Sequence, residues 1–296
     1  MSEQSPVPGF ATAAAEAKTL NRREAQVVRM IARVPYLNSV PFFQGWPLGG
    51  RYELTDCVPR ELGARAAAGE IVAGPLPLMD FFRLEATFER LGHAGIAVRG
   101  RAHSALLFSR KPIRQLEGAT IAITDETSTT VMLLRLVLEK RYGVIPASYE
   151  RRRRAEQRAK SEPASPERRQ EPEADALLLI GDEALRFKHV NMQYPFEIDI
   201  AFEWWLWQHL PFVFAVWAIR KDAAAQEKKQ IEAALMRTLA VNLGQLESIA
   251  QGYSAPLGIP AKDLQAYLSN FVYRMGSAEE SAIKTFRELV NAHHLL

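Results

Sequence analysis

Residues 52–77 read YELTDCVPRELGARAAAGEIVAGPLP, and this stretch indicates an α/β fold. The apolar residues of YELTDCV (52–58) and IVAGPLP (71–77) predict two strands, and PRELGARAAAGE (59–70) between them predicts a helix. This order is typical of parallel α/β units, in which helices cover a sheet. The single cysteine, Cys57, falls in the first strand, so we expect a buried, unreactive thiol and no disulfide within the chain.

The same alternation continues on both sides of this stretch. Further strands are predicted over residues 27–34, 104–109, 119–124, 174–181 and 211–220, with a helix over 128–142. Beyond residue 220 the apolar residues recur at helical spacing, which predicts a long helix around Leu235 and two more near 261–271 and 277–293. The aromatic stretch FEWWLWQHLPFVFAVW (202–217) is more typical of a helix packed on a core strand than of an aromatic ligand site.

The net charge of +3 is unevenly distributed. Residues 150–174 hold eight of the 37 Lys and Arg residues, with six Glu, three Pro and no aromatic or β-branched residue. Such a segment cannot bury enough apolar surface to fold, and it has no aromatic side chain to stack on nucleic-acid bases. We therefore predict a disordered, solvated insertion at 150–174 and no nucleic-acid partner.

Neither the chain start nor any later segment has the pattern of a membrane-inserted sequence. No apolar run reaches 18 residues, so no membrane span is expected. The first 26 residues lack the basic start and apolar core of a secretion signal. We predict a mobile tail over 1–26 and a cytoplasmic protein.

Small polar residues gather where the predicted strands end or begin. Asn38 and Ser39 follow the first strand, Ser104 opens another, and Thr127–Thr130 stand at the start of an apolar helix. A helix start carries unpaired N–H groups and partial positive charge, which suit a carboxylate, and open α/β sheets bind ligands beyond the carboxyl ends of their strands. Helix capping also explains each segment taken alone, so both interpretations stay open at this point.

Standard catalytic motifs are missing from the sequence. It has no Gly-rich phosphate loop, no His-Glu-x-x-His and no Gly-x-Ser-x-Gly. The six histidines are scattered without metal-ligand spacing, and His103, beside Ser104, is interpreted as structural because strand neighbours point to opposite faces. No metal and no cofactor are therefore expected.

Five motifs together resemble one enzyme family. They are PYLNSVPF (35–42), SALLFS (104–109), TSTTVMLLR (127–135), LLLIGDEAL (177–185) and LPFVFAVWA (210–218). In this order and spacing they are similar to chorismate dehydratase, the first enzyme of the futalosine route to menaquinone. The resemblance runs from about Met30 to the C-terminus, outside the charged segment. A Thr-Gly pair usually stands in place of Gln208-His209 in this pattern, and an Asp in place of Val72.

The resemblance implies the two-lobed fold of type 2 periplasmic binding proteins, with a mixed sheet flanked by helices in each lobe and the ligand cleft between them. The expected division is 27–107 with 208–296 for lobe 1, including the C-terminal helices, and 108–207 for lobe 2. By position, the resemblance implies catalytic roles for Asn38 and Ser104. It implies substrate contacts for Ser39, Thr127, Ser128, Thr129, Thr130, Gly181 and Asp182.

The activity implied is a hydro-lyase reaction, in which chorismate loses water to give 3-[(1-carboxyvinyl)oxy]benzoate. Two other classes with this fold stay open. A non-catalytic solute-binding protein for a small carboxylate anion would have a comparable cleft but would require export. The effector domain of a LysR-type regulator would require a preceding helix-turn-helix, and only about 26 polar residues precede Val27. The related futalosine-processing enzymes fit the motifs less well.

Overall fold

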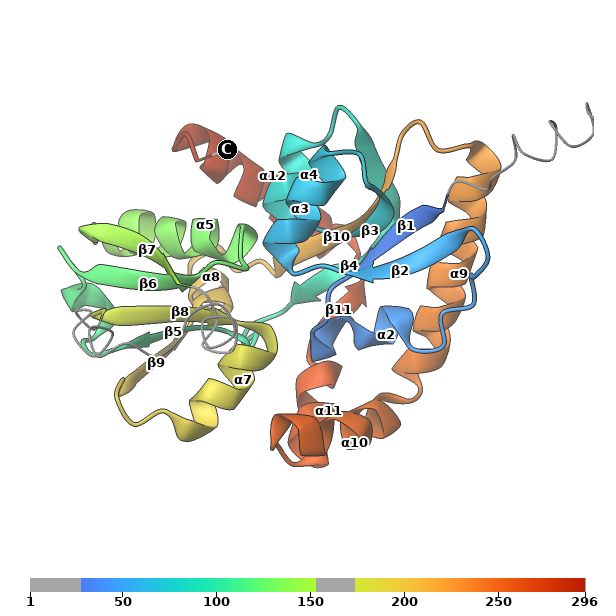
Figure 1. Ribbon diagram of the computed structural model, residues 1–296. Coiled ribbons are helices and arrows are strands. Elements are labelled where there is room, and N and C mark those ends of the chain that lie inside the picture. Colours follow the sequence, from blue (N-terminus) through green and yellow to red (C-terminus); the bar gives the residue numbers. More distant parts are fainter. Residues whose placement is uncertain (1–27, 153–173, 296) are drawn as a thin grey trace, which may run out of the picture.

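The computed structural model describes residues 28–152 and 174–295, which form two α/β lobes side by side (Figure 1). Each lobe has its own sheet with helices on its faces. The predicted tail over 1–26 and residues 153–173 of the predicted insertion lie outside the described residues. Within the described part, no helix is both long and apolar enough to cross a membrane.

The first lobe is built on a six-stranded sheet with the order β11-β4-β10-β3-β1-β2. Its strands are β1 (Arg29–Arg33), β2 (Tyr52–Asp56), β3 (Ile71–Pro77), β4 (Phe88–Val98), β10 (Phe212–Arg220) and β11 (Phe271–Arg274). β1 pairs in parallel with β2 and β3, as the strand–helix–strand sequence predicts. β10 runs antiparallel between β3 and β4, and β11 runs antiparallel to β4, so the sheet is mixed.

The second lobe is built on a five-stranded sheet with the order β7-β6-β8-β5-β9. Its strands are β5 (Ala105–Ser109), β6 (Thr120–Thr124), β7 (Ser148–Arg152), β8 (Ala176–Ile180) and β9 (Phe196–Asp199). β6 is parallel to β7 and β8, whereas β5 is antiparallel to β8 and β9. All of β5 pairs in this sheet, so the predicted lobe boundary after residue 107 falls inside a strand. The division into domains otherwise stays a prediction.

Helices pack on both sheets, and α10 and α11 lie beyond the sheet of the first lobe (Figure 1). In the first lobe they are α2 (Val40–Phe43), α3 (Pro59–Ala67), α4 (Leu78–Arg83), α9 (Ala225–Leu243), α10 (Leu246–Leu257), α11 (Ala261–Ser269) and α12 (Ser277–Ala292). In the second they are α5 (Thr129–Leu136), α7 (Gly181–Val190) and α8 (Ile200–Gln208). A π-helical turn over Val137–Tyr142 continues α5, which ends at Gly143 in the left-handed conformation.

The chain crosses between the lobes twice. The first crossing joins β4 to β5, and there the backbone N–H of His103 donates to Asp199 Oδ2 at 2.7 Å. Asp199 Oδ1 also accepts from the Phe202 N–H at 3.1 Å and so caps α8, and burial raises the pKa of this carboxyl. The second crossing follows α8 at His209, which has a positive φ of 54°. His103 therefore has a structural setting, as the sequence predicts.

Most of the sequence-predicted elements are present, and two predictions are wrong. The region after β10 is not wholly helical, because Phe271–Arg274, at the end of the predicted helix near 261–271 and just beyond it, form β11 along the edge of β4. Residues 150–152, assigned to the insertion, are the last part of β7 and pair with β6. The aromatic stretch does form a helix on a core strand, since Trp204 of α8 is fully buried against Phe212 of β10. Cys57 is buried as well, and burial raises the pKa of its thiol.

Candidate active site

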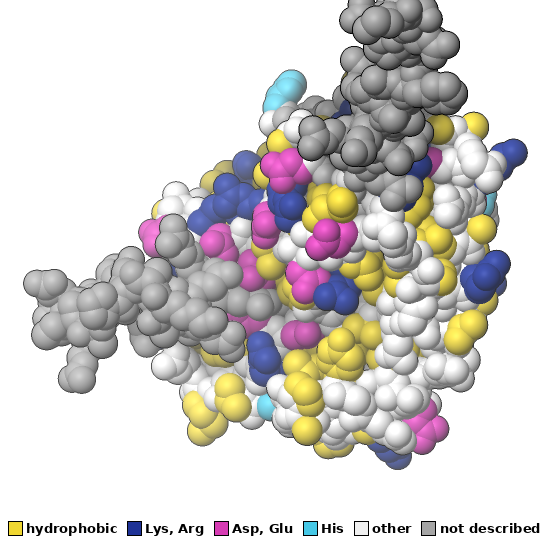
Figure 2. All heavy atoms as spheres, turned by 45° about the vertical axis from the view of Figure 1, so that its right-hand side comes forward, with side chains coloured by type: hydrophobic (Ala, Val, Ile, Leu, Met, Phe, Trp, Pro, Cys, Tyr) yellow, Lys and Arg dark blue, Asp and Glu magenta, His cyan; other side chains and the backbone are white. Residues whose placement is uncertain are grey.

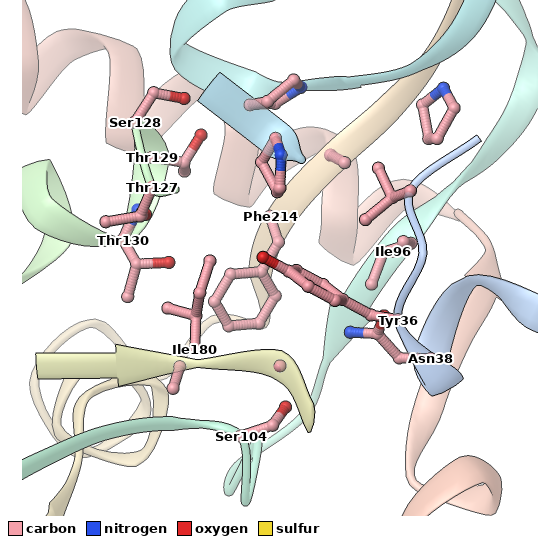
Figure 3. A pocket seen from close by; sticks show the side chains of 17 residues that line it. Tyr36, Asn38, Ile96, Ser104, Thr127, Ser128, Thr129, Thr130, Ile180 and Phe214 are labelled. Carbon is pink, nitrogen blue, oxygen red and sulfur yellow. The ribbon is translucent and has the colours of Figure 1, made fainter. Parts of the chain in front are cut away.

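A small cleft of about 70 Å³ lies between the two lobes (Figure 3). It is lined by Val34, Tyr36, Asn38, Pro59, Pro75, Pro77, Ile96, Ser104, Ala105, Thr127, Ser128, Thr129, Thr130, Ile180, Gly181, Phe214 and Ala215. The first lobe supplies the turn after β1 and residues of β3, β4 and β10. The second supplies the start of α5 and the end of β8. Seven of the nine sequence-predicted site residues therefore meet in one cleft.

Asn38 lies in a 3-10 turn that directly follows β1, over Leu37–Ser39. Its Oδ1 atom is buried and has no hydrogen-bond partner among the described residues. The close-up shows its amide directed toward the interior of the cleft (Figure 3). A buried amide without a partner costs about 1–3 kcal/mol, which marks Asn38 as a group held ready for a ligand.

Ser104 lies just before β5, on the chain crossing, and is held by a residue that the sequence did not reveal. The hydroxyl of Tyr267, from α11, donates to Ser104 Oγ at 2.8 Å. Burial raises the pKa of Tyr267 well above its usual value, so the phenol remains a donor. The Ser104 hydroxyl hydrogen has only a long contact to the Ala102 carbonyl at 3.5 Å, and so it can donate to a ligand.

The hydroxyls at the start of α5 differ in what they already contact. Ser128 Oγ donates to Asp80 Oδ2 of α4 at 2.6 Å, so its hydrogen is committed to the other lobe. Thr129 Oγ1 accepts from the Met79 N–H at 3.2 Å, and Thr127 Oγ1 accepts from the Thr130 N–H at 3.2 Å. These two hydroxyls keep a hydrogen to donate.

Thr130 differs from its three neighbours. Its hydroxyl faces the cleft (Figure 3). Thr127 accepts from an N–H of the first turn of α5 and also lines the cleft, so a capping-type contact is present and the ligand contact stays a prediction.

Tyr36 and Gly181 line the cleft and pack closely against each other. A Cβ on Gly181 would lie 2.8 Å from the Tyr36 ring, and the φ of Gly181 is +59°, so only glycine fits there. The Tyr36 ring reaches across the cleft (Figure 3), and its hydroxyl donates to the buried carboxylate of Glu126 in the second lobe. Tyr36 belongs to the motif PYLNSVPF, but nothing in the sequence distinguishes it as a residue of the cleft.

Two of the sequence-predicted contacts do not line the cleft. Ser39 is buried, and its Oγ lies against the carbonyls of Val34 and Tyr36, so it stabilises the turn that carries Asn38. Asp182 follows the cleft-lining Gly181, and its Oδ1 accepts from the Leu37 N–H at 2.9 Å. Both residues hold the walls of the cleft in place.

The lobes are closed on each other by hydrogen bonds that surround the cleft. They are Tyr36 to Glu126, Leu37 to Asp182, Arg60 N–H to the Glu126 carbonyl, Met79 to Thr129, and Ser128 to Asp80. The enclosed volume of about 70 Å³ is well below the roughly 300–1,000 Å³ of common ligand sites. A ring-sized ligand therefore requires the lobes to separate.

The lining of the cleft carries no ionised group. Its polar side chains are one amide, the hydroxyls and the phenol of Tyr36, and none of its members is Asp, Glu, His, Lys or Arg. Within residues 28–152 and 174–295, no three His, Cys, Asp or Glu side chains are grouped to hold a metal ion. The cleft can thus donate hydrogen bonds to an anion but offers no strong base among the residues that line it.

Comparison with known proteins identifies the family. A model of the menaquinone biosynthesis family matches residues 30–292. The chain belongs to this family. The resemblance given by the five sequence motifs is thereby confirmed. Among curated members, the chorismate dehydratase of Thermus thermophilus is 29% identical over 272 residues, which covers 86% of this chain and 92% of that protein.

Solved structures confirm the fold class. Protein AF1704 from Archaeoglobus fulgidus superposes with a TM-score of 0.70 at 18% identity, covering 92% of this chain and all of that one. The periplasmic aliphatic sulphonate binding protein SsuA from Escherichia coli superposes with a TM-score of 0.56 at 13% identity, covering 92% and 89%. At these identities the likeness shows the fold alone, which is that of periplasmic binding proteins.

The departures from the family pattern lie away from the cleft lining. Val72 is buried in β3, and Gln208 and His209 end α8. His209 adopts the left-handed conformation, which glycine adopts more readily than histidine. The Gln208-His209 pair therefore affects the second crossing between the lobes and not the cleft lining.

Proposed function

We propose that this protein is a chorismate dehydratase, a carbon–oxygen lyase of menaquinone biosynthesis. The observation that carries the proposal is the convergence of Asn38, Ser104 and Thr127–Thr130 in one interlobe cleft. These are the positions at which the family's motifs stand, and a curated relative over most of the chain is a chorismate dehydratase.

The reaction removes a proton from the ring carbon that bears the enolpyruvyl ether and hydroxide from the neighbouring ring carbon. A new double bond forms between these carbons, and the ring becomes aromatic as 3-[(1-carboxyvinyl)oxy]benzoate with release of one water. Aromatisation makes the step strongly favourable. The protein has to orient the ring, assist the leaving hydroxyl and exclude water from a substrate that can also rearrange.

The polar groups of the cleft divide this work between the two lobes. The Asn38 amide and the Ser104 hydroxyl hydrogen-bond the leaving hydroxyl or the ring carboxylate. On the opposite side, Thr127, Thr129 and Thr130 hold a carboxylate at the start of α5, where the helix dipole adds to their hydrogen bonds. One positioned hydrogen bond of this kind is worth about 3 kcal/mol of barrier, or about a hundredfold in rate.

The substrate itself supplies the proton acceptor in this proposal. No carboxylate or imidazole belongs to the lining, and Asn38 and Ser104 are not bases at neutral pH. A carboxylate of the substrate, from which the closed cleft excludes water, therefore accepts the proton from the ring carbon. Lobe closure then positions this carboxylate against the ring hydrogen.

Incubation of the purified protein with chorismate tests the proposal. We expect a product that is lighter by one water and has benzoate absorbance, followed by mass spectrometry and by ultraviolet spectroscopy against a protein-free control. The control matters because chorismate also decays without enzyme. Saturable binding of chorismate without any dehydration would contradict the proposal and favour the solute-binding alternative.

A further inference from the structure

A second hollow, of about 310 Å³, lies beside the cleft between the same two lobes. It is lined by Arg60, Gly63, Ala64, Ala67, Asp80, Arg83, Leu84, Ser128, Val131, Met132 and Arg151. Ser128 lines both hollows, so the segment that begins α5 separates them. We call this second hollow the arginine recess.

Three guanidinium groups from both lobes line the arginine recess. Arg60 begins α3 and Arg83 ends α4 in the first lobe, whereas Arg151 comes from β7 in the second. The only acidic side chain of this lining is Asp80, and it already accepts from Ser128 Oγ at 2.6 Å and from Arg83 Nη1 at 3.2 Å. The lining therefore has an excess of positive charge.

No ion pair within 4.0 Å joins Arg60 or Arg151 to a carboxylate of the described residues, although the charge of Arg60 acts to lower the pKa of Asp80. Arg151 Nη1 donates to the Thr127 carbonyl at 3.3 Å and so contacts the segment that forms the wall of the cleft. Burial, and after it the charge of Arg60, lower the pKa of Arg151, while Asp125 acts in the opposite direction. Two like charges on opposite lobes thus lie close enough to affect each other, and an anion between them would relieve the repulsion.

The arginine recess differs in charge from the cleft beside it. On the face shown in Figure 2, the Lys and Arg side chains of the coloured residues are interspersed with Asp and Glu. The cleft itself has no charged lining residue. A dicarboxylate that enters an uncharged cleft needs its electrostatic attraction from groups outside it.

We propose that the arginine recess is an outer anion site, which binds the dicarboxylate substrate before it enters the cleft. This inference rests on the proposed function, because it takes its ligand from there. A dicarboxylate bound in the recess contacts guanidinium groups of both lobes. It reduces the repulsion between these groups. Ser128, which lines both hollows, lies between it and the cleft.

Charge-removing variants test this inference in steady-state kinetics with chorismate. For Arg60→Gln and Arg151→Gln, we expect kcat/KM about five- to tenfold lower at about 20 mM ionic strength, shrinking to within about twofold at about 0.5 M salt. Arg237→Gln is the matched control, since it removes the same charge from an exposed position on α9, and we expect it to match the wild type. Equal kcat/KM for all four proteins at low salt would overturn the inference and leave the proposed function intact.

A binding measurement separates the two proposals. Isophthalate, an unreactive benzene dicarboxylate, is titrated into the wild type and the variants by calorimetry. We expect Arg60→Gln and Arg151→Gln to weaken its affinity about fivefold or more at low salt, and Asn38→Ala to leave a site of nearly wild-type affinity. If the wild type does not dehydrate chorismate, the proposed function fails, and this titration still decides whether the recess binds dicarboxylates. Isophthalate affinity that depends on Asn38 and not on the arginines would overturn the recess.

Discussion

The two sides of the cleft offer polar groups that look equivalent in the sequence but differ in the folded protein. On the first side, formed by the turn after β1 and the crossing before β5, the Asn38 carbonyl is buried without a partner among the described residues, and the Ser104 hydroxyl accepts a hydrogen bond from Tyr267. On the second-lobe side, Ser128 and Thr129 already bond residues of α4 or its start. Tertiary contacts, and not residue type, decide which groups can bind a ligand. Chemistry is therefore assigned to the first side and anion binding with lobe closure to the second.

The largest expected effect comes from the first side. Asn38→Ala and Ser104→Ala should each lower kcat for chorismate dehydration by about a hundredfold or more, because each removes a positioned hydrogen bond at the reacting ring. Ser39→Ala is the neighbouring control. It should lose about 1 kcal/mol in unfolding free energy, measured in urea, and keep kcat within a few-fold, since Ser39 bonds only the backbone of its own turn. A Ser39 variant as inactive as Asn38→Ala would contradict the distinction drawn between these neighbours.

The support behind Ser104 should give a smaller effect. Tyr267→Phe removes the donor at 2.8 Å and frees the serine to rotate, so we expect kcat about tenfold lower with KM nearly unchanged. Tyr273→Phe is the matched control, because Tyr273 is also buried and its hydroxyl has no partner among the described residues. Circular dichroism and thermal unfolding check that both variants are folded. Equal kcat for the two phenylalanine variants would show that Tyr267 does not position Ser104.

The smallest effects are expected on the second side, and there in KM. Thr130→Val removes a hydroxyl that faces the cleft and should raise KM about fivefold, the cost of one hydrogen bond to a carboxylate. Ser128→Ala removes a hydroxyl whose hydrogen is bound to Asp80, and it should change KM by less than about twofold at high salt. The reverse order of these two KM values would show that Ser128 leaves Asp80 and contacts the substrate.

Local features of the chain were predictable, and long-range ones were not. The strand–helix–strand unit over 52–77 and the hydroxyl cluster at the start of α5 follow from periodicity and capping chemistry, which act over a few residues. β4 was missed because Gly92 and Gly95 interrupt its apolar pattern, and β11 because four residues are too few to show a period.

The candidate site follows the same rule. Ser104 and Tyr267 are 163 positions apart, so no local pattern could connect them. Ser39 and Asp182 were predicted to contact the substrate but do not line the cleft, because a polar side chain beside a cleft residue has the same sequence signature as one inside the cleft. The arginine recess was hidden for the same reason, since its three cations come from α3, α4 and β7.

The strand order of the first sheet has a consequence for how the protein is made. β10 is inserted between β3 and β4, yet it is synthesised more than a hundred residues after them. A nascent chain can finish the entire five-stranded sheet while the six-stranded one still has a gap at its centre, with the unpaired backbone edges of β3 and β4 exposed. In ribosome-bound intermediates, the second lobe should therefore become resistant to protease before the first lobe does. The first lobe should depend on chaperones until β10 emerges from the ribosome.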